Sequence, residues 1–77
     1  MKEDFIVKEE YTNEICKTNE EIWALQMEQS DRIKECYFTG DLPQKQFYEF
    51  SCEFLSRMIE LCEKQKEIAE KVLKENN

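Results

Sequence analysis

The only glycine and the only proline of this chain, Gly40 and Pro43, stand close together near its middle. The long stretches on either side contain no strong helix breaker and carry apolar residues at helical spacing. A single break of this kind predicts two long helices, and a connection this short forces them to pack antiparallel. The predicted fold is therefore all-α, an antiparallel helical hairpin forming one domain over residues 1–77, with helices at about 3–38 and 42–75.

The residues of the break predict how each helix ends and begins. Gly40 follows the first helix and is expected to take the left-handed conformation that closes many helices. Asp41 is expected to cap the second helix, with Gln44 completing a capping box and Pro43 in the first turn.

The second helix carries an apolar heptad repeat with a wide apolar sector. Its main row begins at Phe47 and alternates steps of four and three residues as far as Val72. Two further rows flank it: Tyr48, Leu55, Cys62 and Ala69, then Cys52, Ile59 and Leu73. Because the sector is wider than one partner helix needs, this helix is expected to contact more than one neighbour.

The first helix is regular by elevens, a spacing close to that of a straight helix. Gln29 and Arg32 interrupt its heptad seam. The two rows at eleven-residue spacing are Tyr11, Ile22 and Ile33, and Phe5, Cys16, Met27 and Phe38. Residues equally far from Gly40 are expected to face each other, which predicts contacts between Trp23 and Met58 and between Met27 and Phe54.

This excess of apolar surface favours self-association, because an exposed patch of that size is unusual on a soluble monomer. Two hairpins would form a four-helix bundle, and more would form a larger helical oligomer. The residues expected at the oligomer interface are Ile15, Ile22, Trp23, Leu25, Met27, Ile33, Phe47, Phe54, Met58, Leu61, Ile68 and Val72.

The charge balance excludes several classes of partner. The net charge is −7, and no stripe of Lys and Arg is present to neutralise phosphates. Direct nucleic-acid binding and binding to anionic membranes are therefore not expected. No apolar run is long enough to span a bilayer or to serve as a signal peptide, so the expected location is the cytoplasm.

Neither a metal site nor a catalytic site is expected. The chain has four cysteines, none spaced as Cys-x-x-Cys, and no histidine. Zinc sites that need histidine are excluded, and no nucleophile has an adjacent base. We expect no enzymatic activity, no cofactor and no metal, and we expect the cysteines to be buried free thiols.

Three functions remain. The first is a protein–protein interaction module, an acidic homo-oligomeric hairpin acting as a small regulator, adaptor or inhibitor, of the kind that mobile elements encode. Its glutamates would then present negative charge to a basic partner, even a nucleic-acid-binding groove. The candidate partner surface comprises Glu9, Glu10, Glu14, Glu20, Glu21, Tyr37 and Phe50.

The second function is a helical oligomer that binds a nucleotide-like ligand between subunits. Its candidate residues are Tyr11 with Lys8 and Tyr37 with Lys34, because such a ligand needs an aromatic ring beside a cation. The third is a structural subunit of a larger complex, with its second apolar face covered by another polypeptide.

Overall fold

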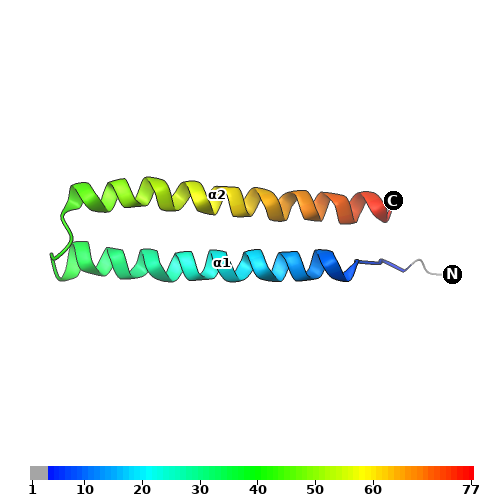
Figure 1. Cartoon of the computed structure of the whole chain (residues 1–77), viewed down its shortest axis with the longest axis horizontal. Helices are drawn as coiled ribbons and strands as arrows, with labels where there is room; N and C mark the ends of the chain where they lie inside the picture. Colours follow the sequence, from blue (N-terminus) through cyan, green and yellow to red (C-terminus); the bar gives the residue numbers. More distant parts are fainter. Residues whose placement is uncertain (1–3) are drawn as a thin grey trace.

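The computed structural model describes residues 4–77 and shows two long helices lying side by side (Figure 1). Helix α1 spans Glu9–Ile33 and continues into a π-helical turn, η1, over Lys34–Phe38. Helix α2 spans Gln44–Glu75 and returns antiparallel to α1, so that the start of α1 and the end of α2 lie at the same end of the hairpin. The predicted all-α hairpin is confirmed.

The first helix begins later than predicted, at Glu9, and its predicted start at residue 3 lies outside the described residues. Residues 4–8 lie outside the helix, and Lys8 is extended, with φ −65° and ψ 142°. The side chain of Asn76 holds this segment in place, since it accepts a hydrogen bond from the Ile6 N–H at 2.8 Å and donates one to the Ile6 carbonyl at 2.7 Å. These two bonds clamp the N-terminal segment to the end of α2.

The turn confirms the prediction for Gly40 and contradicts the one for Asp41. Gly40 has φ +76°, in the left-handed region. Asp41 does not cap α2: the helix starts at Gln44, and Pro43 precedes it in extended conformation with no side-chain cap. The reason is the proline itself, which disfavours helical geometry at the residue before it, so a helix cannot start at Asp41 or Leu42.

Replacing Gly40 with alanine is expected to destabilise the hairpin by about 1–2 kcal/mol, the cost of holding an L-residue in the left-handed region. No heavy atom lies within 4 Å of a Cβ built at this position, so the cost is purely conformational. Gly40→Asn is the matched control and should cost less, because asparagine tolerates this conformation. Urea denaturation followed by circular dichroism measures both. Equal stability of the alanine variant and the native protein would contradict the prediction.

The last turn of the first helical stretch is wider than an α-helical turn. The Thr39 N–H donates to the carbonyl of Lys34 at 3.0 Å, five residues back, and the Thr39 hydroxyl donates to the Glu35 carbonyl at 3.1 Å. The Leu42 N–H also reaches the Glu35 carbonyl at 3.1 Å. Carbonyls left free at the helix end are thus satisfied within the turn.

The helices meet along one seam with a heptad repeat in both. Every seam residue is buried or half-buried, and the most buried apolar side chains are on α2, such as Leu61 at 2% exposure and Phe54 at 4%. The seam comprises Tyr11, Ile15, Thr18, Ile22, Leu25, Gln29, Arg32 and Cys36 from α1 and η1, and Phe47, Ser51, Phe54, Met58, Leu61, Gln65, Ile68 and Val72 from α2. The heptad predicted for α2 is confirmed.

Of the two eleven-residue rows predicted for the first helix, only Tyr11 and Ile22 of the first row belong to its packed face. Phe5, Cys16, Met27 and Phe38 are all exposed, whereas Gln29 and Arg32 lie in the seam. Arg32 fits there because its guanidinium lies over the ring of Phe50, 5.3 Å from the ring centroid, and pairs with Glu35 at 2.6 Å. A long side chain that packs its stem and keeps its charge paired fills a seam position as well as an aliphatic residue.

One polar pair also lies inside the seam. Thr18 is 1% exposed, and its hydroxyl accepts a hydrogen bond from the Gln65 amide at 2.8 Å. The same hydroxyl lies 3.0 Å from the carbonyls of Glu14 and Ile15. Because Thr18 and Gln65 belong to different helices, their hydrogen bond favours this register of the two helices over shifted ones.

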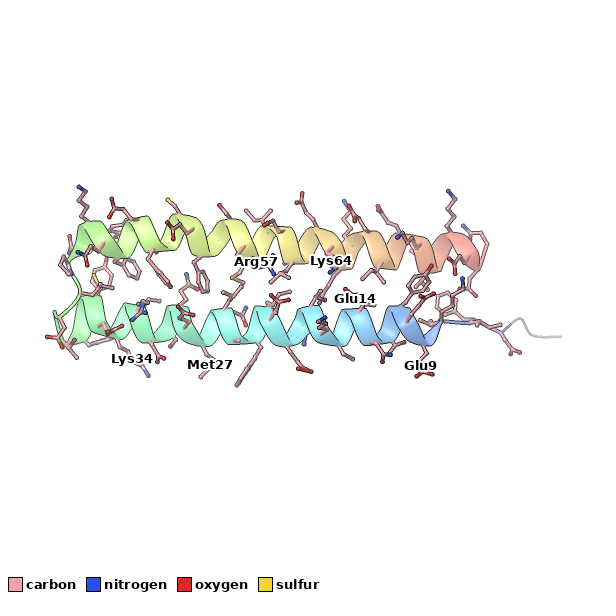
Figure 2. The ribbon with its side chains drawn as sticks, viewed as in Figure 1. Glu9, Glu14, Met27, Lys34, Arg57 and Lys64 are labelled. Atoms are coloured by element: carbon pink, nitrogen blue, oxygen red, sulfur yellow. The ribbon has the colours of Figure 1, made fainter. Side chains whose placement is uncertain are left out.

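The helix register lies close to the predicted one, but two side chains point elsewhere. Met27 lies on the side of α1 away from α2 (Figure 2) and is 49% exposed, so its predicted contact with Phe54 is wrong. Trp23 is 62% exposed rather than packed in the seam beside Met58. The four cysteines are free thiols, but only Cys36 is buried, which corrects the expectation for the other three.

Candidate protein interaction surface

The antiparallel arrangement gives the hairpin two different flanks. Successive residues of an α-helix are rotated by about 100°. Since the two helices run in opposite directions, the residue after each seam position lies on one side of the hairpin in both helices, and the residue before it lies on the other. The contacts between the helices agree with this assignment. Tyr37 and Tyr48 each follow a seam residue, and their hydroxyls are hydrogen-bonded at 2.5 Å. Glu21 and Arg57 each precede a seam residue, and they form an ion pair at 2.7 Å.

The polar flank is the side formed by the residues that precede the seam positions, and it carries most of the ordered charges. Lys64 pairs with Glu14 at 2.8 Å, and both side chains lie between the helices in Figure 2. Arg57 pairs in the same way with Glu21. The α1 part of this flank is strongly acidic and the α2 part supplies the bases. The polar flank comprises Glu10, Glu14, Lys17, Glu21, Ala24, Glu28, Asp31, Glu35, Gln46, Phe50, Glu53, Arg57, Glu60, Lys64, Glu67 and Lys71.

The apolar flank is the side formed by the residues that follow the seam positions. It is nearly free of charge, and all of its residues are exposed. Lys66 is its one charged residue, although 38% of the chain is charged. Its largest side chains are far from buried, with Trp23 at 62% and Ile59 at 59% exposure. The apolar flank comprises Thr12, Cys16, Asn19, Trp23, Gln26, Ser30, Ile33, Tyr37, Tyr48, Cys52, Leu55, Ile59, Cys62, Lys66, Ala69 and Leu73.

The structure divides the residues expected at an oligomer interface into two groups. Trp23, Met27 and Ile33 are exposed on α1, the first and third on the apolar flank. The others lie in the seam of a single hairpin: Ile15, Ile22, Leu25, Phe47, Phe54, Met58, Leu61, Ile68 and Val72. The α2 residues of the apolar flank belong to the two further apolar rows of the second helix, which the expected interface does not include.

The residues expected to form a partner surface do not lie together. Glu14 and Glu21 are paired with bases on the polar flank, beside Glu10 and Phe50. Tyr37 lies on the apolar flank. Glu9 points away from α2 (Figure 2), and Glu20, two residues after seam position Thr18, also belongs to the outer side of α1.

The tyrosine and lysine pairs proposed for a nucleotide-like ligand are engaged within the hairpin or separated. Lys8 lies over the Tyr11 ring, 5.8 Å from its centroid, and pairs with Glu75 at 3.6 Å. Lys34 points away from α2 (Figure 2), whereas Tyr37 bonds to Tyr48. A shallow depression of about 280 Å³ lies on the polar flank, lined by Glu10, Tyr11, Glu14, Lys64, Glu67, Ile68 and Lys71. Its three carboxylates do not favour a phosphate group.

Hydrogen bonds between side chains shift several pKa values. The hydrogen bond and charge of Lys64 hold the pKa of Glu14 below its ordinary value. The hydrogen bond that Tyr11 donates to Glu75 at 2.5 Å lowers the pKa of Glu75 and raises that of Tyr11. The hydroxyl of Tyr48 raises the pKa of Tyr37 to about 12. These groups are exposed, and their pKa shifts follow from contacts between the two sides of the hairpin.

Replacing Glu14 with glutamine is expected to remove a pH-dependent part of the stability. Because the folded-state pKa of Glu14 is lowered, its pairing with Lys64 stabilises the fold fully above the ordinary glutamate pKa of about 4.3. This contribution is lost as the pH falls through the lower pKa of the folded state. The stability difference between the native protein and Glu14→Gln should therefore be largest at neutral pH and vanish in acid, as measured by urea denaturation at several pH values.

Glu10→Gln is the control on the same flank, because Glu10 forms none of the ion pairs described above. Its effect should change less with pH. A Glu14→Gln difference that stays constant from neutral pH into acid would contradict the role of the ion pair.

Within residues 4–77, no group of three or more Cys, Asp or Glu side chains is placed to hold a metal ion. No helix in this part of the chain combines the length and the apolar character needed to cross a bilayer. The fold and its surface define a two-faced helical hairpin with one charged and one apolar flank. No family model matches the chain, and neither curated proteins nor solved structures give a match.

Proposed function

We propose that this protein is a non-enzymatic protein–protein interaction module that self-associates through the apolar flank into a four-helix bundle. It acts as a small regulator, adaptor or inhibitor in the cytoplasm, where reducing conditions keep exposed cysteines as thiols. The observation that carries the proposal is the apolar flank itself, a continuous exposed strip with Lys66 as its one charge. Such a strip on a helix pair is typical of a surface that is covered in the assembled state.

The exposed area of the single hairpin supports the same conclusion. A compact monomer of 9.4 kDa would expose about 5,000 Å². The hairpin exposes 6305 Å². One seam between two helices leaves each helix with most of its surface in water, and a second contact would bring the exposed area toward that of an ordinary globular protein.

The apolar flank is large enough for a stable dimer. From Thr12 to Tyr37 it runs for roughly 38 Å at 1.5 Å per residue, and the hairpin is 18 Å across. Face-to-face contact of two such flanks would bury on the order of 1,300 Å² in total, within the range of specific protein interfaces. The polar flank is a poor alternative, because two copies of its acidic α1 side would repel each other.

Dimerisation through the apolar flank would leave the acidic outer sides of both hairpins free for a second protein. Glu9 and Glu20 lie there, and their charges are not drawn into the cross-helix pairs that engage Glu14 and Glu21. A basic partner protein fits such a surface, and its binding should weaken as ionic strength rises. The structural-subunit function would differ in one respect: the apolar flank would be covered by another polypeptide.

Sedimentation equilibrium of the purified, reduced protein tests the proposal. We expect a single species at twice the chain mass of 9.4 kDa, with no need for another component. Polydisperse aggregates would favour the structural-subunit function, since a missing partner leaves the flank exposed. A stable monomer at micromolar concentration would contradict self-association.

A further inference from the structure

The level of each residue along the apolar flank follows from one observed contact. The hydroxyls of Tyr37 and Tyr48 are 2.5 Å apart, so these residues lie at the same height on the two helices. Because the seam keeps a heptad repeat, moving seven residues along both helices preserves the pairing. Successive steps place Ser30 beside Leu55, then Trp23 beside Cys62.

The size of the side chains changes along the flank. Near the turn it carries Tyr37, Tyr48 and Ile33, all large. Toward the chain ends it carries Cys16 and Ala69, one further heptad from the turn than Trp23 and Cys62. Apart from Lys66 and Leu73, the side chains toward the chain ends are small, so the flank is on average higher at the turn than near the chain ends.

A closed dimer with flank against flank has two arrangements. With both turns at one end, large residues meet large ones, small residues meet small ones, and Lys66 lies at the same level as Lys66 of the second copy. With the turns at opposite ends, the high part of each flank meets the low part of the other. Close packing along the whole interface favours the second arrangement.

We propose that the second copy binds with its turn at the opposite end, so that the twofold axis crosses the apolar flank between Trp23 and Cys62. This inference rests on the proposed self-association. The level of Trp23 and Cys62 is close to the middle of α1 with η1 (Glu9–Phe38) and of α2 (Gln44–Glu75), so an axis there gives the greatest overlap. Trp23 then lies at the centre of the interface, where large aromatic residues contribute most to binding.

The cysteines of the chain report this geometry directly. Cys62 lies beside the proposed axis, so the two copies of Cys62 face each other within reach of a disulfide. Cys52 is ten residues away along α2, which separates its two copies by roughly 30 Å at 1.5 Å per residue. In the arrangement with both turns at one end, the two copies of Cys52 are as far apart as the two copies of Cys62.

The experiment compares three double variants, each retaining one exposed cysteine: Cys16→Ala with Cys52→Ala, Cys16→Ala with Cys62→Ala, and Cys52→Ala with Cys62→Ala. Buried Cys36 is kept in all three. Each is oxidised with copper–phenanthroline in air, and the covalent dimer is quantified on non-reducing gels. We expect the variant that retains Cys62 to cross-link at least about tenfold faster than those that retain Cys52 or Cys16.

The outcomes separate this inference from the proposed function. Sedimentation equilibrium of the reduced variants comes first, and monomers there would overturn both. A dimer in which Cys52 cross-links as fast as Cys62 would overturn the opposite-end arrangement alone. As a positive check, adding Leu73→Cys to the variant that retains Cys52 should create a fast cross-link, because Cys52 then faces position 73 of the second copy; its absence would also count against the arrangement.

Discussion

Replacing Ile59 with lysine is expected to convert the dimer into separate hairpins. Ile59 is 59% exposed in the single hairpin and lies near the middle of the apolar flank, so the change spares the seam. In the proposed dimer it buries two ammonium groups without acidic partners, each beside Lys66 of the second copy, and at about 2 kcal/mol each the dissociation constant should rise by roughly 10³-fold. Sedimentation equilibrium over a range of concentrations measures the shift.

Glu63→Gln is the matched control for this change. Glu63 is also exposed on α2 but lies on its outer side, two residues after seam residue Leu61. Its removal should leave the dimer intact. If Ile59→Lys and Glu63→Gln sediment with the same mass as the native protein, the apolar flank is not the contact surface.

Replacing Leu61 with alanine is expected to cause the largest loss of stability. Leu61 is 2% exposed at the centre of the seam, and removing its side chain there should cost about 2–5 kcal/mol. A chain of this length has only roughly 4–11 kcal/mol of total stability, so much of the population should unfold at low concentration. Thermal and urea denaturation followed by circular dichroism measure the loss.

Leu55→Ala gives the same chemical change on the apolar flank, where Leu55 is 46% exposed. It should weaken the dimer and lower the stability of the hairpin less than Leu61→Ala does. Equal losses at very low protein concentration, where dimers are absent, would mean that the seam and the apolar flank are not separate surfaces.

The second helix could be predicted from the sequence because its heptad has apolar residues at nearly every seam position, from Phe47 to Val72. The packed face of the first helix could not be predicted in the same way, since its seam includes Thr18, Gln29 and Arg32. Two of them are accommodated by residues far away in the sequence, Thr18 by Gln65 and Arg32 by Phe50. Large apolar residues stand out more clearly in the sequence of the first helix, and several of them lie on its other faces.

Only part of the candidate interaction surface could be predicted from the sequence, for a related reason. The apolar rows of α2 and the residue Trp23 stand out in the sequence, but their placement on one side of the hairpin depends on the register between helices. That register is set by contacts such as Tyr37 with Tyr48 and Glu21 with Arg57. Once one such pair is known, the antiparallel geometry assigns every other residue to a flank.

The π-helical turn η1 has a consequence for insertions and deletions in related chains. A single deletion inside α1 would rotate every residue on one side of it by about 100° and move Ile22 or Leu25 out of the seam. A π turn holds about one residue more than an α-helical turn. Deleting one residue between Lys34 and Phe38 would return it to ordinary helix and leave the rest of α1 in register. Length variation in this helix should therefore be tolerated beside the turn and rejected elsewhere.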